Sequence, residues 1–236
     1  MKGLLLALQF LTTLPLPRVH ADREDFVLSM RWFPLAGIVV GAVVMGAAWL
    51  GMRHDGWTGA LLALAAWVLV TGALHLDGLG DIADAAGAAH GDRARLSAVL
   101  ADPHIGSFGV VAIGMQLLAK LVLLHALLDQ HPLWTLAAIP AIARIGPLAW
   151  ARWLPPLHEG LGSLFRDAVG RRHLLGWSLA ASLACAFAPA LAVGLIAMPL
   201  WAWWLKARIG GISGDGHGAG IELVETALLA ALVLVP

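Results

Sequence analysis

Long apolar runs alternate with short polar segments along almost the whole chain. Runs close to the roughly 20 apolar residues that a helix needs to cross a bilayer lie at residues 33–51, 57–76, 107–128, 133–151 and 220–236. A sixth apolar region, residues 174–205, has Pro189 near its middle. Because proline interrupts the hydrogen-bond ladder of a helix, we expect two short crossings there. The pattern predicts an all-α, polytopic integral membrane protein with about seven transmembrane helices.

The apolar run at the N-terminus is shorter than the others. In MKGLLLALQFLTTLPLPRVHA it holds about 12 residues, too few to span a bilayer, and Pro15 and Pro17 end it. The basic start and Val19-His20-Ala21 loosely match a cleaved signal peptide, but charged residues follow the prolines at once. We therefore expect a retained short helix that lies at the membrane interface or re-enters the membrane.

Basic residues gather on one side of this layout. Lys and Arg are concentrated in residues 15–32, 77–106, 152–173 and 206–219, whereas the short connections on the opposite side carry essentially Arg53 alone. Cationic loops stay on the cytoplasmic side of a membrane. We therefore expect a multi-pass protein of the cytoplasmic (inner) membrane, embedded in the lipid bilayer, with its active site facing the cytoplasm.

Composition supports the membrane assignment. Hydrophobic residues make up 60% of the 236 residues and charged residues only 13%, which is about half the charged share of a typical soluble domain. The length favours a single membrane-embedded domain over residues 1–236. The formal net charge is zero, so we expect no nucleic acid partner.

The stretch TGALHLDGLGDIADAAGAAHGD, residues 71–92, places three carboxylates directly after an apolar run. Spacings of four and then three residues put Asp77, Asp81 and Asp84 on one helical face, within an arc of about 60°. Three anions so close repel one another unless a cation lies among them, and carboxylate oxygens suit Mg²⁺ or Mn²⁺. Magnesium often completes its coordination with substrate phosphate oxygens, so the stretch predicts a metal–phosphate site at the membrane surface. The alternative is a solvated helix end whose acids line up by chance.

A second polar patch, DRARLSAVLADPHIGSFG, covers residues 92–109. Arg93 and Arg95 are candidates to clamp phosphate groups, or they are simply the positive charges of a cytoplasmic loop. Asp102 is a candidate further ligand for metal or substrate. Ser107 is expected to cap the next helix, whose N-terminus can hold an anion.

A third patch, GGISGDGHGAGIELVE, covers residues 210–225 and is rich in glycine. Its backbone amides are available to an anion, although no Gly-Lys-Ser/Thr follows and the patch is therefore not a Walker loop. The candidate substrate-binding residues are Gly211, Ser213, Gly214, Asp215, His217 and Glu222. Among them, His217 is a candidate acid or base. The alternative is a flexible linker, but linkers seldom carry Asp, His and Glu into a membrane span.

Two basic residues stand inside the predicted spans. Lys120 and Arg144 are costly at membrane depth and normally face a partner or a polar cavity. We expect each either to draw a substrate phosphate or to pair with an acid. His75 and His125 are interpreted as core or interfacial histidines with satisfied hydrogen bonds.

Five stretches together resemble the cobalamin synthase family, the adenosylcobinamide-GDP ribazoletransferases. They are FLTTLPLP, FPLAGIVVGA, TGALHLDGLGDIADA, DPHIGSFG and GGISGDGHGAGIEL, and they occur in the order typical of the family over nearly the whole chain. This chain has Gly80 where the family usually has Ala, Ala85 where it has Gly, Ser213 where it has Thr and Pro103 where it has Ser. None of these departures removes a carboxylate.

The resemblance implies a magnesium-dependent membrane transferase that completes the lower ligand of cobalamin. Its substrates are adenosylcobinamide-GDP and α-ribazole or α-ribazole 5′-phosphate, and GMP is released. We expect the ribazole 5′-hydroxyl to attack the cobinamide-linked phosphorus, with Asp77, Asp81 and Asp84 as magnesium ligands. One of these three or Asp102 would act as general base.

The remaining roles concern the substrate. Arg93, Arg95 or Lys120 would neutralise phosphate oxygens. Asp215 and the amides around it would bind the guanine nucleotide or the second substrate. The sequence leaves the formation of a homo-oligomer open.

Two other functions fit part of the pattern. A CDP-alcohol phosphotransferase acting on a lipid shares spaced aspartates and a displaced nucleotide, but the residues after Asp84 lack the two later aspartates of that family. A transporter would place its carboxylates near the bilayer midplane, whereas these acids cluster at one end of a span. Lipid-substrate assays and flux measurements distinguish the two.

Overall fold

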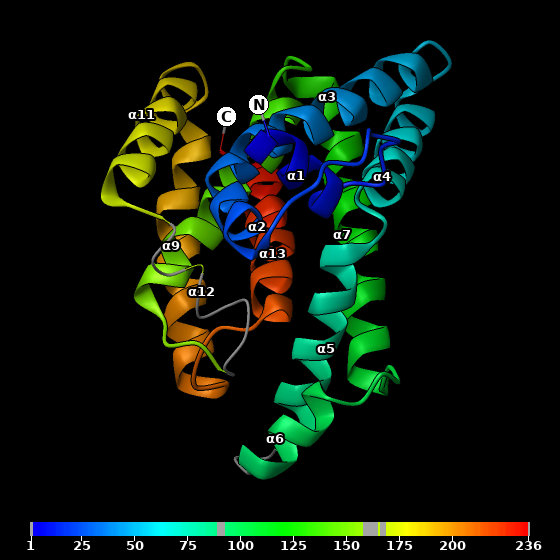
Figure 1. The fold of residues 1–236 in the computed structure, drawn as a ribbon. Coiled ribbons are helices and arrows are strands. Elements are labelled where there is room, and N and C mark those ends of the chain that lie inside the picture. Colours follow the sequence, from blue (N-terminus) through cyan, green and yellow to red (C-terminus); the bar gives the residue numbers. More distant parts are fainter. Residues whose placement is uncertain (1, 89–92, 158–164, 166–168, 236) are drawn as a thin grey trace.

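The computed structural model describes residues 2–88, 93–157, 165 and 169–235, and the described chain folds into a bundle of helices (Figure 1). The helices of the first half are α1 (Lys2–Leu11), α2 (Arg23–Ser29), η1 (Met30–Trp32), α3 (Phe33–Met52), α4 (Gly56–Thr71), α5 (Leu74–Ala88), α6 (Arg93–Leu100) and α7 (Ser107–Gln130). Those of the second half are α8 (Thr135–Ala143), α9 (Ile145–Trp153), α11 (Arg171–Phe187), η2 (Pro189–Val193), α12 (Gly194–Arg208) and α13 (Gly214–Leu234). The only extended pairing within the described ranges is an isolated bridge between Pro156 and Ile212. The all-α prediction is therefore confirmed.

Several helices are long and apolar enough to cross a membrane. Within the described residues they are Arg23–Met52, Ser107–Gln130, Pro189–Arg208 and Gly214–Leu234, with α4 and α5 as a possible fifth, bent span. A multi-pass membrane protein is thus confirmed, with fewer uninterrupted spans than the seven expected. Two of the expected crossings are broken, and each break has a local cause.

The expected crossing at 133–151 is two short helices that meet at Arg144. Pro140 lies inside α8, and Pro147 has no N–H to donate to the carbonyl of Ala143, so the ladder fails between them. Arg144 therefore lies between the two helices, and its side chain is buried in the core. The expectation of one continuous helix here is wrong, because Pro140 and Pro147 interrupt the hydrogen-bond ladder.

The expected crossing at 57–76 bends by 84°. Gly72 and Ala73 both have φ of +58°, which ends α4 and starts α5 in a new direction. Thr13 adds hydrogen bonds to the carbonyls at the end of α4: its amide donates to Val70 O at 2.8 Å, and its hydroxyl donates at 2.8 Å to Leu69 O, which also accepts the Gly72 N–H at 3.2 Å. The segment after α1 thereby fixes the corner from which α5 departs.

The break expected near Pro189 is confirmed. Helix α11 ends at Phe187, and Pro189 starts the short η2 turn that leads into α12. Helix α1 packs on α2, η1 and α3. Leu11, Met30 and Phe33 form part of a small hydrophobic cluster there, which is separate from the main core. At about 15 Å in length α1 is too short to span a bilayer.

Close helix packing explains one of the five stretches that resemble the family. In FPLAGIVVGA, a Cβ added at Gly41 would meet the backbone of Ala137 at 2.5 Å, and one at Gly37 would overlap the carbonyl of Pro140. These two glycines, four residues apart, let α3 lie directly on α8, as small residues do in membrane helix pairs. This contact anchors the broken helix pair α8–α9.

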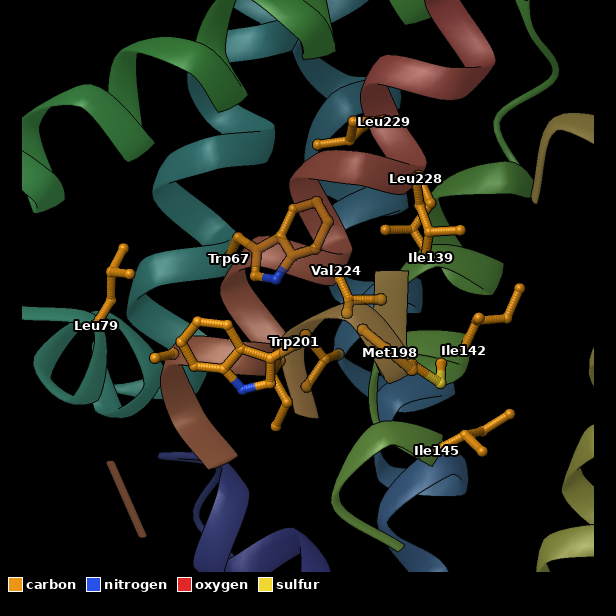
Figure 2. Packing of buried hydrophobic residues seen from close by; sticks show 14 of the residues in the cluster. Trp67, Leu79, Ile139, Ile142, Ile145, Met198, Trp201, Val224, Leu228 and Leu229 are labelled. Carbon is orange, nitrogen blue, oxygen red and sulfur yellow. The ribbon is translucent and has the colours of Figure 1, made fainter. Parts of the chain in front are cut away.

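Helix α13 lies in the middle of the bundle and contacts α5, α7, α8 and α12 (Figure 1). Its buried face joins the main hydrophobic core, in which Val224, Leu228 and Leu229 lie among Trp67 and Met198 (Figure 2). The last turns of α13 are thus held by packing, and its first turn, at Gly214, is placed beside α5.

Candidate active site

The three acidic residues of α5 lie in three different environments. Asp77 is exposed, Asp81 is half-buried, and Asp84 is buried with 7% of its surface accessible. They share one arc of the helix, as its periodicity requires. However, Asp84 lies about two turns from Asp77, at the level where α7 begins.

The carboxylate of Asp84 is occupied by backbone amides from another segment. Gly106 N–H donates to its Oδ2 at 2.7 Å, and Gly109 N–H donates to its Oδ1 at 2.9 Å. These amides belong to the first turn of α7, where a helix has no internal acceptors. Ser107, the expected cap, is instead the first helical residue, and Gly106 occupies the cap position. The capping prediction for Ser107 is therefore wrong, because the acceptor comes from α5.

Asp81 lies in a concentration of negative charge. Asp215, Asp77 and Asp84 all repel its carboxylate, and among the three Asp215 does so most strongly. Asp215 belongs to the first turn of α13, which rests on α5 at Gly78: a Cβ added to Gly78 would meet the carbonyl oxygen of Asp215 at 2.8 Å. The structure thus brings Asp77 and Asp81 together with an acid from the third sequence patch, a neighbour that spacing along the chain did not reveal.

A divalent cation suits this donor set by its chemistry. Carboxylate oxygens are the ligands that Mg²⁺ prefers, and a cation would relieve the repulsion around Asp81. Yet in the part of the chain that the structure describes, no three His, Cys, Asp or Glu side chains are arranged closely enough to hold a metal ion. Asp77, Asp81 and Asp84 therefore do not form a ready-made metal cage, since Asp84 is bound to α7.

Asp102 lies in the turn between α6 and α7, in the second polar patch of the sequence. Its Oδ1 lies 2.7 Å from Nδ1 of His104 and accepts the His104 backbone N–H at 3.0 Å, and both side chains are exposed. The hydrogen bonds from His104 lower the pKa of Asp102. A carboxylate of lowered pKa is a weak acceptor for a hydroxyl proton, which argues against Asp102 as general base. The side chains of Arg93 and Arg95, on α6, lie outside the described residues.

The glycine-rich stretch before α13 packs against the segment that follows α9. Ile212 N–H donates to Pro155 O, and Leu157 N–H donates to Ile212 O, both at 2.9 Å. Gly210 has φ of +98°, and a Cβ on Gly211 would meet Pro155 O at 2.6 Å. At this end of the stretch the glycines serve close packing of the backbone, which gives Gly211 a structural role.

The next residues start α13. Ser213 caps the helix, since its Oγ accepts the Gly216 N–H at 3.1 Å. A Cβ at Gly214 would meet nothing within 4 Å, so the backbone there is open to a ligand. By contrast, both ring nitrogens of His217 are shielded from solvent without a hydrogen-bond partner in the described structure, and the ring stacks 6.1 Å from that of Trp150. This placement favours Gly214 over His217 as a substrate contact.

Lys120 and Glu222, two predicted substrate contacts, are bound to each other inside the core. Lys120 Nζ lies 2.7 Å from Glu222 Oε2 and 2.6 Å from Glu225 Oε2, and all three residues are buried. Gln116 donates to Glu222 Oε2 at 2.8 Å. The structure therefore does not bring Lys120 or Glu222 to a surface that substrate can reach, and it confirms the other expectation, that the intramembrane cation pairs with an acid.

Arg144 belongs to the same buried network. Its Nη1 donates to Glu225 Oε1 at 2.9 Å and to Pro140 O at 3.0 Å, and its Nη2 lies 3.4 Å from His75 Nδ1. Two cations therefore meet two anions, and the pairing links α7, α13 and the junction of α8 and α9. Glu225 and Gln116 were not among the predicted residues. The signal for Glu225 was present, because it and Glu222 are the only acids in the last apolar run.

A large apolar groove lies on the side of α5 that faces away from the acids. Its volume is about 460 Å³, and its walls include Ile82 and Ala86 of α5, Trp204 of α12 and Leu223 of α13. On a helix, Ile82 and Ala86 project more than a quarter turn away from Asp81. The groove is therefore separate from the carboxylate cluster.

Comparison with known proteins identifies the relatives of the chain. A model of the family described as cobalamin-5-phosphate synthase matches residues 3–233. A protein of Novosphingobium aromaticivorans named adenosylcobinamide-GDP ribazoletransferase is 56% identical over 99% of this chain and 97% of its own length. Proteins of the same name from Thiobacillus denitrificans and Laribacter hongkongensis are 49% and 48% identical, over 97% and 99% of this chain and 94% and 97% of their own lengths. No solved structure matches the chain.

Proposed function

The chain belongs to the cobalamin-5-phosphate synthase family, and on that premise we propose that it is an adenosylcobinamide-GDP ribazoletransferase whose active site is the cluster of carboxylates around Asp81. The reaction completes the lower ligand of cobalamin. A single structural observation carries the placement: α5 and the first turn of α13 bring three acidic side chains, Asp77, Asp81 and Asp215, into one neighbourhood.

The transfer is a displacement at phosphorus. A ribose hydroxyl of α-ribazole, or of its 5′-phosphate, attacks the cobinamide-linked phosphorus of the pyrophosphate. The new phosphorus–oxygen bond forms while the bond to the bridging oxygen breaks, and that oxygen leaves with GMP. The family description names a 5-phosphate product, which favours a hydroxyl other than the 5′ one as nucleophile when the acceptor carries the 5′-phosphate.

Negative charge accumulates on the phosphate oxygens during such a transfer, so positioning and electrostatics dominate its catalysis. Among the described residues Asp77, Asp81 and Asp215 are not close enough to form a complete metal site, so we propose that they would hold Mg²⁺ together with water and the phosphate oxygens of the substrate. When bound, the cation would offset charge on the pyrophosphate and the leaving GMP. Asp81, half-buried among these acids, is the candidate to accept the hydroxyl proton.

The start of α13 supplies a contact for the substrate anion. The amide-rich first turn lies at a helix N-terminus, which attracts phosphate groups, and the backbone at Gly214 is open. Ser213 fixes this turn by capping it. We assign the nucleotide half of adenosylcobinamide-GDP to this turn, next to Asp215.

The orientation in the membrane follows from charge. The end of the bundle that carries Asp102, Arg208 and the start of α13 is the end rich in basic residues, and such ends face the cytoplasm. We therefore place the active site on the cytoplasmic face of the inner membrane. After replacement of the single cysteine, Cys185→Ser, a His104→Cys variant should react with a membrane-impermeant thiol reagent in inside-out vesicles and resist it in intact cells.

The activity is tested directly. Protein purified in detergent is incubated with Mg²⁺, adenosylcobinamide-GDP and α-ribazole, and GMP and the corrinoid product are measured by chromatography and mass spectrometry. The wild type should form both, Asp81→Asn neither, and Asp129→Asn, which changes an exposed acid at the far end of α7, should match the wild type. Failure of the wild type to form GMP, with turnover of CDP-diacylglycerol instead, would reject the proposal in favour of a lipid phosphotransferase.

A further inference from the structure

The two buried hydrogen bonds of Asp84 join the first sequence patch to the second. Asp84 lies on α5, whereas Gly106 and Gly109 lie 22 and 25 residues later at the start of α7. Burial of a carboxylate is unfavourable unless it is paired, and here both oxygens accept an amide at the positive end of the α7 dipole. The carboxylate is therefore stabilised by the helix that it caps.

Space around this carboxylate is taken up by backbone. A Cβ added to Gly106 would meet Oδ1 of Asp84 at 2.5 Å, and one on Gly109 would overlap Oδ2. A magnesium ion at about 2.1 Å from an oxygen carries further ligands around it. The backbone at Gly106 and Gly109 therefore crowds the approach of such a shell to the buried carboxylate of Asp84.

The same contact sets how α5 and α7 pack. Above and below Asp84, Gly80 and Gly87 face α7: added Cβ atoms there would meet Ile113 at 3.1 Å and Phe108 at 2.6 Å. The seam between the helices thus consists of glycine, aspartate and glycine. Because Asp84 binds the first amides of α7, its position on α5 determines where α7 begins.

We propose that Asp84 is a positioning residue: by holding the amides of Gly106 and Gly109, its buried carboxylate fixes turn 102–106 and the start of α7 beside Asp81. The role in catalysis rests on the proposed function, because it requires that Asp81 belong to the active site. The structural part does not depend on that function. Asp84 thereby acts through the segment that it holds and does not touch substrate or metal.

The structural part is tested by a double-mutant cycle between Asp84→Ala and Gly106→Ala. Gly106 has φ of −93° and ψ of 179°, which alanine adopts freely, so Gly106→Ala should lower the unfolding temperature only through its collision with Asp84. In the Asp84→Ala background the same substitution should cost clearly less. Equal costs in both backgrounds would overturn the proposal.

Hydrogen exchange gives a second readout. Loss of Asp84 frees the amides of Gly106 and Gly109, and exchange there should become faster by about tenfold or more, because bonds to a charged acceptor protect strongly. Asp84→Asn, which keeps one acceptor oxygen, should give an intermediate increase. Unchanged exchange in both variants would also overturn the proposal. If Asp84→Ala does not fold, hydrogen exchange in Asp84→Asn decides the structural part, because Asn keeps the collision with Gly106→Ala and cannot serve in the cycle.

Measurements of metal binding distinguish a positioning role of Asp84 from a role as metal ligand. Mn²⁺ binding, followed by electron paramagnetic resonance, should weaken strongly in Asp81→Asn and stay within about twofold of wild type in Asp84→Asn. In the transfer assay Asp84→Asn should lower kcat with little change in the Mg²⁺ concentration for half-maximal rate. Equal weakening of Mn²⁺ binding by both variants would make Asp84 a ligand. Absence of any transfer by the wild type would reject the proposed function, while exchange and the mutant cycle would still decide the role of Asp84.

Discussion

Lys120 on α7 holds its ammonium group 2.7 Å from the carboxylate of Glu222 on α13, with 2% of Lys120 and 3% of Glu222 accessible. Glu225 and Arg144 complete a network of two positive and two negative charges. Lys120 also lies 4.5 Å from the ring centre of Trp67 on α4. The network thus fastens the helix that carries Asp215 to α7 and to the junction of α8 and α9.

Removal of one charge from this network should destabilise the fold. Lys120→Met leaves an uncompensated buried carboxylate, and the expected loss is about 3–5 kcal/mol, measured as a lower unfolding temperature in detergent. Lys120→Met combined with Glu222→Gln restores neutrality and should recover part of the loss. Lys206→Met, at an exposed position, serves as the control. A Lys120→Met protein as stable as the control would contradict the structural role.

Because α5 and α13 approach closely at Gly78, we expect substitution of Gly78 by alanine to be far more destabilising than the same substitution at Gly114. Gly78→Ala places a methyl group 2.8 Å from the carbonyl oxygen of Asp215, and overpacking of this kind costs about 1–3 kcal/mol. Activity should fall with it, because the first turn of α13 must move away from Asp81. Gly114→Ala on α7 meets nothing within 4 Å and should be neutral or slightly stabilising. Thermal unfolding and the GMP assay check both variants, and equal behaviour of the pair would refute the packing argument.

The corner between α4 and α5 depends on Thr13. Thr13→Val keeps the shape of the side chain but removes the hydroxyl that donates to Leu69 O, and we expect a loss of about 1 kcal/mol. Because α5 starts three residues after the end of α4, the rate of transfer should fall by more than the folded fraction does. The ratio of activity to folded protein, measured by size-exclusion chromatography and the GMP assay, reports this. If the activity and the amount of folded protein fall in proportion, Thr13 contributes only to stability.

The pKa of Asp102 yields a prediction about pH. Hydrogen bonds from His104 lower this pKa. The ionised carboxylate therefore stabilises the turn at every pH above the unfolded pKa of about 3.9. This stabilisation is lost as the pH falls through the lower pKa of the folded state. Between about pH 6 and pH 9 its charge does not change. Asp102→Asn should therefore leave the shape of the pH–kcat profile unchanged in that range. Disappearance of one limb of the profile would identify Asp102 as the general base after all.

Much of the site was predictable from sequence because its residues are local. The spacing of Asp77, Asp81 and Asp84 defines one face of a helix in any fold, and the apolar runs define the membrane class. The break at Pro189 follows from the missing N–H of proline. These inferences need no knowledge of what packs against what.

Other features depended on neighbours that are distant in sequence. Ser107 is a good capping residue by type, but α7 is capped from α5 by Asp84. Lys120 is a good phosphate ligand by type, but Glu222 and Glu225 neutralise it. In both cases the residue type suggested a plausible interaction, but a residue distant in sequence makes a different one in the folded protein.

The order of residues is enough to establish a helical membrane protein of the cobalamin-5-phosphate synthase family with three carboxylates on one helical face. It is not enough to show that Asp215 joins Asp77 and Asp81 while Asp84 binds the start of α7. Helical periodicity fixes which residues share a face, whereas long-range packing selects the helices that meet this face, here through glycines that let α7 and α13 approach α5.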